Sequence, residues 1–361
     1  MVIVRRVLVF ASVVALAGTT PLVAQRGGNA PRGGAAPKIS DAQRKAIQSI
    51  LTVADDAAAG KAMPNDLGLT WLHDDLMKVT QQGQAFVPFV ISLDPAKVTP
   101  GPLSVYWRVV DKNAPPPPPA DAKKDDKKAP AAPTFAYESL TTATAVAGEP
   151  TIISRSFSTH AGSYDVYVVV KEGNSAMGDN KDKKDDKNAP PQKVAVIKQP
   201  MEVPDLWNGE LSTSSVIVAE KIERLTAPLS NEQKISHPYA LGAIEIVPYT
   251  RTKFTKKDEL AVFILVYNSK MDSANKPDVK VEFNFFTKQG GGEKLFNSTL
   301  PTNLNGQTLT PQDIASGQLQ AGQSVPLASF PEGDYRMEVK VTDNVAKKTV
   351  SRDVNFTVSG S

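Results

Sequence analysis

The sequence contains no cysteine and only three histidines among its 361 residues. Without cysteine the chain has neither a disulfide framework nor a site for a lipid anchor. Beyond its first residues it also lacks any apolar run long enough to cross a bilayer. Lysine and arginine total 41 against 38 aspartates and glutamates. The strong basic charge typical of nucleic-acid binding is therefore missing, and we expect no nucleic-acid partner.

Residues 1–24 have the pattern of a secretory signal peptide. Arg5 and Arg6 form the charged start, 7–18 form an apolar middle too short to span a membrane, and 22–24 form the cleavage site. A retained signal anchor is the alternative. We expect the mature chain to be exported, periplasmic or extracellular, with no integral membrane segment once the signal is removed.

The N-terminal part of the mature chain changes from a leader to a helix. Residues 25–38 are rich in Gly, Ala and Pro, which predicts a flexible leader. A helix is expected over 39–64, with Ser40 and Gln43 forming a capping box at its start. Its apolar residues at helical spacing are Ala46, Ile47, Ile50, Leu51, Ala54 and Ala58. One helix of this length is marginal alone, so it should dock on another element.

Two segments with alternating apolar residues organise the rest of the chain. In both, a Gly stands two residues before a Tyr, and every second residue after that Tyr is apolar. The two sets are Tyr164, Val166, Val168 and Val170, and Tyr335, Met337, Val339 and Val341. A period of two predicts a strand with one face on a core. A Tyr in this position is typical of the tyrosine corner of immunoglobulin-like sandwiches, so Tyr164 and Tyr335 are assigned that structural role.

The sequence therefore predicts a mainly β protein, with two immunoglobulin-like or fibronectin III-like antiparallel β-sandwiches in tandem, preceded by one short α-helix. The first sandwich is expected over 66–204 and the second over 206–359, with a hinge at 204–209. Two Pro-flanked Lys/Asp runs hold almost no large apolar residues, and we predict disordered inserts at 113–133 and 174–192.

Three finer expectations concern the second sandwich. The apolar run 260–267 suits a central strand that is covered on both faces. The stretch 301–322 is rich in Asn, Gln, Gly and Pro and predicts a long loop. Arg352 falls in phase with the apolar residues of the last strand, which indicates a β-bulge or an edge position.

The outward faces of the two tyrosine strands differ in polarity. In the second strand the outward residues are all polar: Arg336, Glu338, Lys340 and Thr342. In the first, the middle of that face carries Tyr167 and Val169. We favour the explanation that the helix starting after Ser40 covers them; the alternative is an exposed contact surface for a partner.

Only one place sets a histidine beside carboxylates, His73-Asp74-Asp75. A hydrolytic or metal site could be built from these residues. However, neighbours in a strand point to opposite faces, and no second His lies close in the sequence. We therefore assign no catalytic, cofactor-binding or metal-binding residue, and we expect the protein not to be an enzyme and to need no cofactor.

The second half also resembles a known group of proteins. The matching stretches are 246–248 (Ile-Val-Pro), 276–279 (Lys-Pro-Asp-Val), 330–335 (Phe-Pro-Glu-Gly-Asp-Tyr) and 340–343 (Lys-Val-Thr-Asp). They resemble the immunoglobulin-like C-terminal module of uncharacterised exported proteins of soil bacteria, which in some members follows a von Willebrand A-type domain. The resemblance covers about 206–359 well and the first half loosely. It implies a β-sandwich and export, and it supplies no catalytic residue.

Two functional hypotheses remain from the sequence. The first is an exported, non-enzymatic binding or interaction protein of the cell envelope, with a protein or a glycan as its partner. The second is a structural spacer or assembly component of the envelope or cell surface. A partner captured tightly would favour the first, and weak self-association alone would favour the second.

Overall fold

The computed structural model describes residues 40–61, 63–79, 82–114, 135–173, 175–177, 192–289 and 291–360. The predicted signal peptide, the leader and most of both predicted inserts lie outside these residues.

The one long helix of the described chain, α1 (Asp41–Ala58), begins where Ser40 caps it. The Ser40 hydroxyl accepts a hydrogen bond from the Gln43 amide at 3.1 Å, which satisfies one free amide of the first turn. The Gln43 side chain does not complete the predicted capping box. Its Nε2 atom donates to the Ala176 carbonyl at 3.1 Å, which links the start of the helix to the segment after β7. Gly60 follows the helix with φ of 75°, a conformation that glycine adopts without strain.

The first sandwich consists of two four-stranded antiparallel sheets. One sheet contains β1 (Thr70–Asp74), β2 (Met77–Lys78), β3 (Gln84–Leu93) and β6 (Thr151–His160). The other contains β4 (Gly101–Asp111), β5 (Tyr137–Ala145), β7 (Gly162–Glu172) and β8 (Val194–Val203). In the first sheet β3 pairs with β1, β2 and β6, and the order in the second is β5-β4-β7-β8.

The second sandwich consists of two six-stranded sheets, in the order β11-β12-β10-β14-β18 with β9 on β14, and β13-β20-β19-β15-β16 with β17 on β15. The first sheet contains β9 (Ser212–Thr213), β10 (Ile217–Arg224), β11 (Ala240–Leu241), β12 (Ile244–Pro248), β14 (Glu259–Tyr267) and β18 (Gln318–Pro326). The second contains β13 (Lys253–Thr255), β15 (Asp278–Gln289), β16 (Gly292–Ser298), β17 (Thr302–Asn305), β19 (Gly333–Asp343) and β20 (Lys348–Ser359). All pairs are antiparallel except β13 with β20.

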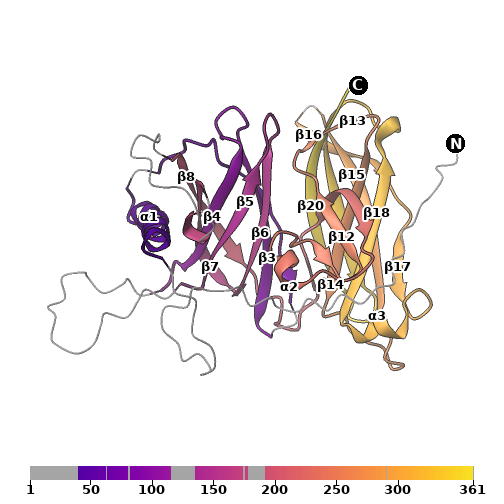
Figure 1. Ribbon diagram of the computed structural model, residues 1–361. Coiled ribbons are helices and arrows are strands. Elements are labelled where there is room, and N and C mark those ends of the chain that lie inside the picture. The colour runs from indigo at the N-terminus through magenta and orange to yellow at the C-terminus, as the bar shows by residue number, and fades with distance from the viewer. Residues whose placement is uncertain are drawn as a thin grey trace.

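Figure 1 shows the two sandwiches side by side, with α1 on the side of the first that faces away from the second. Four short helices complete the described chain: η1 (Ser175–Met177), α2 (Asn231–Lys234), α3 (Pro311–Ala315) and η2 (Leu327–Ser329). The predicted mainly β fold of sandwich domains is confirmed.

One of the finer expectations and part of one predicted insert need correction. The stretch 301–322 is not one loop, because it contains β17, α3 and the start of β18. These strands are polar in sequence and form because they pair along β15 and β14, respectively. Residues 175–177, placed by sequence in a disordered insert, form η1, and Ala176 is buried against α1.

The position of Arg352 agrees with the second of its two alternatives. It lies opposite Val339 in a β19–β20 ladder that contains no bulge. On the other side of β20, β13 pairs only with residues 357–359. Arg352 is therefore at an unpaired edge, where its side chain reaches solvent.

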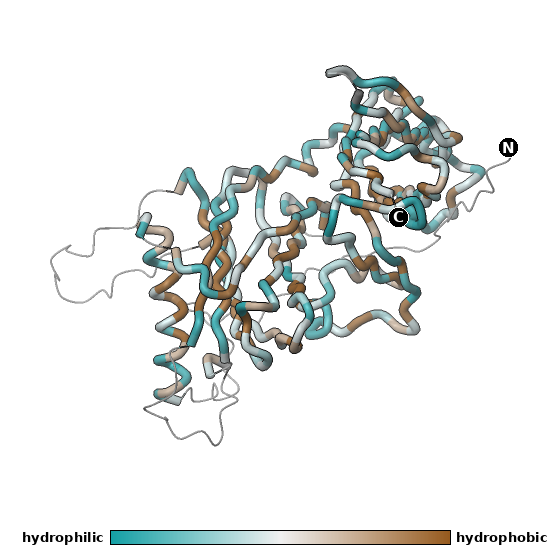
Figure 2. Tube along the Cα trace, turned by 90° about the horizontal axis from the view of Figure 1, so that it is seen from above, coloured by the Kyte–Doolittle hydropathy of each residue, from teal (hydrophilic) through white to brown (hydrophobic). Residues whose placement is uncertain are grey.

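Strand β14 is covered on both faces, as predicted. Its residues Leu260, Val262, Ile264 and Val266 join the core between the two sheets of the second sandwich. The alternate residues Phe263, Leu265 and Tyr267 belong to a buried cluster that continues through the first sandwich. One apolar core thus runs across the boundary between the sandwiches, and Figure 2 shows hydrophobic stretches along the strands of both.

The linker between the sandwiches is packed in place and is not a free hinge. Leu206 is buried, and its carbonyl accepts a hydrogen bond from the side-chain amide of Asn268 at 3.1 Å. The Trp207 indole donates to the Gln84 carbonyl at 2.8 Å. The Lys78 ammonium lies 4.0 Å from the centre of the Trp207 ring. These contacts tie the linker to both sandwiches.

Candidate functional site

The two tyrosines assigned as corners make the same local contact. The Tyr164 hydroxyl donates to the His160 carbonyl at 3.0 Å, and the Tyr335 hydroxyl donates to the Pro331 carbonyl at 2.7 Å. Each phenol reaches the backbone four residues upstream, and both rings are buried. This bond fixes the start of β7 and of β19 against the preceding connection, which is a structural role.

The apolar face of the first tyrosine strand is closed by α1. Tyr167 and Val169 on β7 are both buried, and they share a cluster with Ile50 and Ala54 of the helix and with Val196 of β8. Tyr167 and Val169 therefore do not form an exposed contact surface, because the helix removes them from solvent. The apolar stripe of α1 and this sheet face bury each other, which stabilises both.

Polar contacts hold α1 in a defined position on that face. Arg108 of β4 is buried, and its guanidinium donates to the Asp55 carboxylate at 2.6 Å and to the Ala54 carbonyl. The Lys171 ammonium donates to the Ser49 hydroxyl at 2.7 Å. Burial lowers the pKa of Lys171. Two cations of the sheet thus fix two points along the helix.

The matching face of the second sandwich is polar and open. Arg336 of β19 binds Glu293 of β16 at 2.8 Å and Asp353 of β20 at 2.6 Å. The hydrogen bond to Glu293 raises the pKa of Arg336. The hydrogen bond from Arg336 in turn lowers the pKa of Glu293. No helix of the described chain covers this face.

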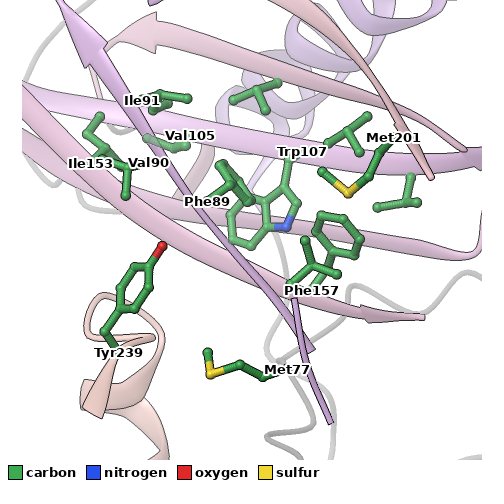
Figure 3. Close-up of a cluster of buried hydrophobic side chains, with 14 of the residues drawn as sticks. Met77, Phe89, Val90, Ile91, Val105, Trp107, Ile153, Phe157, Met201 and Tyr239 are labelled. Atoms are coloured by element: carbon green, nitrogen blue, oxygen red, sulfur yellow. The ribbon is translucent and has the colours of Figure 1, made fainter. Parts of the chain in front are cut away.

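The residues His73, Asp74 and Asp75 lie at the boundary between the sandwiches. Asp75 is buried, and its Oδ2 accepts a 2.8 Å hydrogen bond from the hydroxyl of Tyr239, which belongs to the second sandwich. The Nδ1 atom of His73 lies 3.5 Å from the same oxygen. Figure 3 shows Tyr239 reaching with its hydroxyl toward the strands of the first sandwich. We call this group, His73, Asp75 and Tyr239, the seam cluster.

Asp74 has a hydrogen-bond partner outside the seam cluster. Its Oδ1 accepts from the Trp71 indole at 3.0 Å. Burial raises the pKa of Asp74, and the bond from Trp71 partly opposes this shift. Burial, with the nearby Asp75 carboxylate, also raises the pKa of Tyr239 well above its usual value, so its hydroxyl stays a donor.

Backbone contacts beside the seam cluster join the sandwiches further. The Ser215 amide donates to the Leu76 carbonyl at 2.9 Å, and the Leu76 amide donates to the Ser215 hydroxyl at 2.9 Å. The Lys78 amide donates to the buried Tyr267 hydroxyl at 3.1 Å. The segment between β1 and β2 is therefore hydrogen-bonded to the second sandwich along its length.

The chemistry available at this cluster is limited. Asp75 is already engaged by Tyr239, and the Nε2 atom of His73 is buried with no hydrogen-bond partner. Over the described ranges, no group of three or more His, Asp or Glu side chains could hold a metal ion. The other histidines lie elsewhere: His160 contacts the Gly83 carbonyl at 2.9 Å and His237 contacts Glu245 at 2.6 Å.

Sequence reasoning missed two residues that organise these sites. Arg108 had a usable signal, because a lone cation in the otherwise apolar run of β4 indicates a buried partner. Tyr239 had none, since nothing in the sequence relates it to Asp75, 164 residues earlier.

No helix of the described residues is both long and apolar enough to cross a membrane. No family model matches the chain, and no curated protein matches it. Among solved structures, the crystal structure of Salmonella alpha-2-macroglobulin reacted with methylamine is similar over 82% of this chain, at 10% identity and a TM-score of 0.21. The chain spans 15% of the length of that structure. A TM-score this low supports no conclusion about the function of the chain.

Proposed function

We propose that the chain is an exported, non-enzymatic interaction protein of the cell envelope, with a protein or a glycan as its partner. The main support is the role of Asp75, the buried carboxylate beside His73. At the boundary between the sandwiches, Asp75 accepts a hydrogen bond from the Tyr239 hydroxyl. The carboxylate therefore helps to hold the two domains together. A buried, satisfied carboxylate is a poor general base for a substrate in solvent.

Export is supported by the signal-peptide pattern of residues 1–24. Mass spectrometry of the protein produced by its own cells should find an N-terminus at or near Gln25 in a soluble envelope or extracellular fraction. An intact Met1 in a membrane fraction would mean a retained signal anchor.

The interaction role is tested by capture from the envelope. The purified protein is immobilised and exposed to envelope proteins and glycans of its own cells, with the heat-unfolded protein as the control. We expect the folded protein to retain a defined partner that the control does not retain. Hydrolytic turnover that disappears in His73→Ala, while the thermal unfolding midpoint is kept, would overturn the non-enzymatic assignment.

A structural spacer is the second candidate, and the packed linker favours it. The contacts of Leu206 and Trp207, together with the core shared across the boundary, make the two sandwiches one stiff body. Because the chain has no cysteine, one introduced cysteine in each sandwich can carry a spin label. A narrow distribution of label distances, with no partner captured, would favour the spacer; a broad distribution would exclude it.

A further inference from the structure

Strand β16 is an edge strand with an unusual surface. It pairs with β15 on one side and ends its sheet on the other. Three of the large hydrophobic side chains that the described residues expose lie on it or just after it: Leu295 at 54%, Phe296 at 36% and Leu300 at 61%. An exposed, apolar edge strand offers free backbone groups and apolar side chains to another strand.

Three other edges in the described part of the chain are protected, those at β8, β5 and β13. The outer edge of β8 is paired with the segment before β1, where the Val196 amide donates to the Pro64 carbonyl at 2.9 Å and the Asp66 amide donates to the Val194 carbonyl at 3.1 Å. At β5, the side chain of Arg155 donates to the Thr142 carbonyl at 2.5 Å. The edge strand β13 is only three residues long. Short strands and covering side chains are the usual defences against edge pairing.

The two faces of β16 are distinct. Leu295 lies opposite Phe286 of β15, on the outer face that also carries the ion pair of Glu293 with Arg336. The next residue, Phe296, sits at a register shift and turns to the inner side, where its ring lies 4.9 Å from that of Phe330. Leu295 is thus the apolar residue of β16 that has no cover within its own chain.

We propose that β16 is a self-association edge, through which two copies of this chain pair their β16 strands antiparallel about a twofold axis. The pairing is centred on Leu295, so that this residue faces its own copy and Lys294 faces Phe296 of the other chain. The six-stranded sheet of one copy then continues into that of the second. This goes beyond the proposed function and holds for either candidate.

The sequence of β16 selects this register. A pairing centred on Lys294 sets two lysines opposite each other, and one centred on Glu293 sets two glutamates opposite each other; like charges directly opposite are destabilising. A pairing centred on Phe296 sets the exposed, apolar Leu295 against the polar Asn297. The Leu295-centred register opposes no like charges and buries the most exposed apolar side chain of the strand. β16 is therefore complementary to itself.

Solution mass tests the proposal. The wild-type protein should have twice the monomer mass at high concentration by light scattering. Leu295→Lys should shift it to the monomer, because two lysines would then face each other across the axis. The matched control is Val146→Lys, at a residue of the first sandwich that is 55% exposed, and it should stay dimeric. A wild-type monomer at every concentration, or a dimer that survives Leu295→Lys, would overturn the proposal.

A single introduced thiol tests the register, since the chain has no cysteine of its own. Directly opposite residues of an antiparallel pair have Cβ atoms about 4.5–5.5 Å apart, close enough for a disulfide after small adjustment. Leu295→Cys should therefore give a covalent dimer on mild oxidation. Lys294→Cys and Val146→Cys should not, whereas a mixture of Lys294→Cys and Phe296→Cys should. Equal cross-linking of all single variants would indicate random collision and contradict the pairing.

Discussion

The hydroxyl of Tyr239 and the carboxylate of Asp75 meet at 2.8 Å although 164 residues separate them, and each belongs to a different sandwich. Both side chains are buried, so the bond forms in a region of low dielectric where an unpaired carboxylate is costly. This pair connects the polar part of the seam cluster to the apolar core that surrounds it.

Removing the Tyr239 hydroxyl should destabilise the whole chain. Tyr239→Phe leaves Asp75 without its donor from the second sandwich, and hydrogen bonds to charged groups contribute about 1.5–3 kcal/mol. Denaturant unfolding measures the loss. Tyr249→Phe is the matched control, because that hydroxyl contacts only Arg251 near the surface, and it should cost about 0.5 kcal/mol or less. Equal losses in the two variants would contradict the role given to the seam.

Removing the hydroxyl of the corner tyrosine should cost less stability than removing a buried side chain from the same strand. Tyr335→Phe removes one hydrogen bond, to the Pro331 carbonyl, and should cost about 1 kcal/mol. Val339→Ala deletes buried methyl groups and leaves a cavity, so it should cost roughly 2 kcal/mol. Lys340→Ala, on the outer face, is the control for the strand register. A neutral Val339→Ala beside a costly Lys340→Ala would mean that the strand faces the other way.

The covered face of the first sandwich should not tolerate a charge. Val169 and Lys340 each lie five residues after a corner tyrosine, but Val169 is buried under α1. Val169→Asp would bury an unpaired carboxylate and should cost roughly 3–5 kcal/mol. Lys340→Gln, at the matching open position, should cost about 0.5 kcal/mol or less. Thermal unfolding measures both, and a tolerated Val169→Asp would show that α1 leaves this face in solution.

The stability should depend on pH through Asp74. Burial raises its pKa in the folded protein above the unfolded value, so the folded state binds this proton more tightly. Its contribution is therefore most favourable in acid and is lost as pH rises through the folded pKa. Asp74→Asn keeps an oxygen for the Trp71 indole without the charge. At neutral pH the variant should unfold at a higher temperature than wild type, and the gain should shrink as the pH falls toward the usual range of aspartate. A constant gain at all pH values would contradict this account.

The regular parts of both sandwiches could be predicted because their pattern is local. Alternation along β7 and β19 shows which side chains face a core, and the continuous apolar run of β14 predicts cover on both faces. The helical spacing after Ser40 likewise predicts α1 and its apolar stripe. Each of these features is set by a short stretch of neighbouring residues.

Other parts depend on contacts that no local pattern contains. Strands β17 and β18 are rich in Asn, Gln and Thr and form because β15 and β14 offer them backbone partners. The choice between a covered and an exposed Tyr167 required the position of α1 in space. The seam cluster could not be found from sequence either, since strand alternation describes His73 and Asp75 but not the residue that approaches them from the second sandwich.

The core shared across the boundary also has a consequence for the order of folding. A growing chain completes β3 and β6 long before β10, β12 and β14, the strands whose side chains continue their core. Until these strands are made, the nascent first half carries an uncovered apolar sheet, which is a binding surface for chaperones and a risk of aggregation. A protein truncated after residue 205 would expose this apolar sheet permanently.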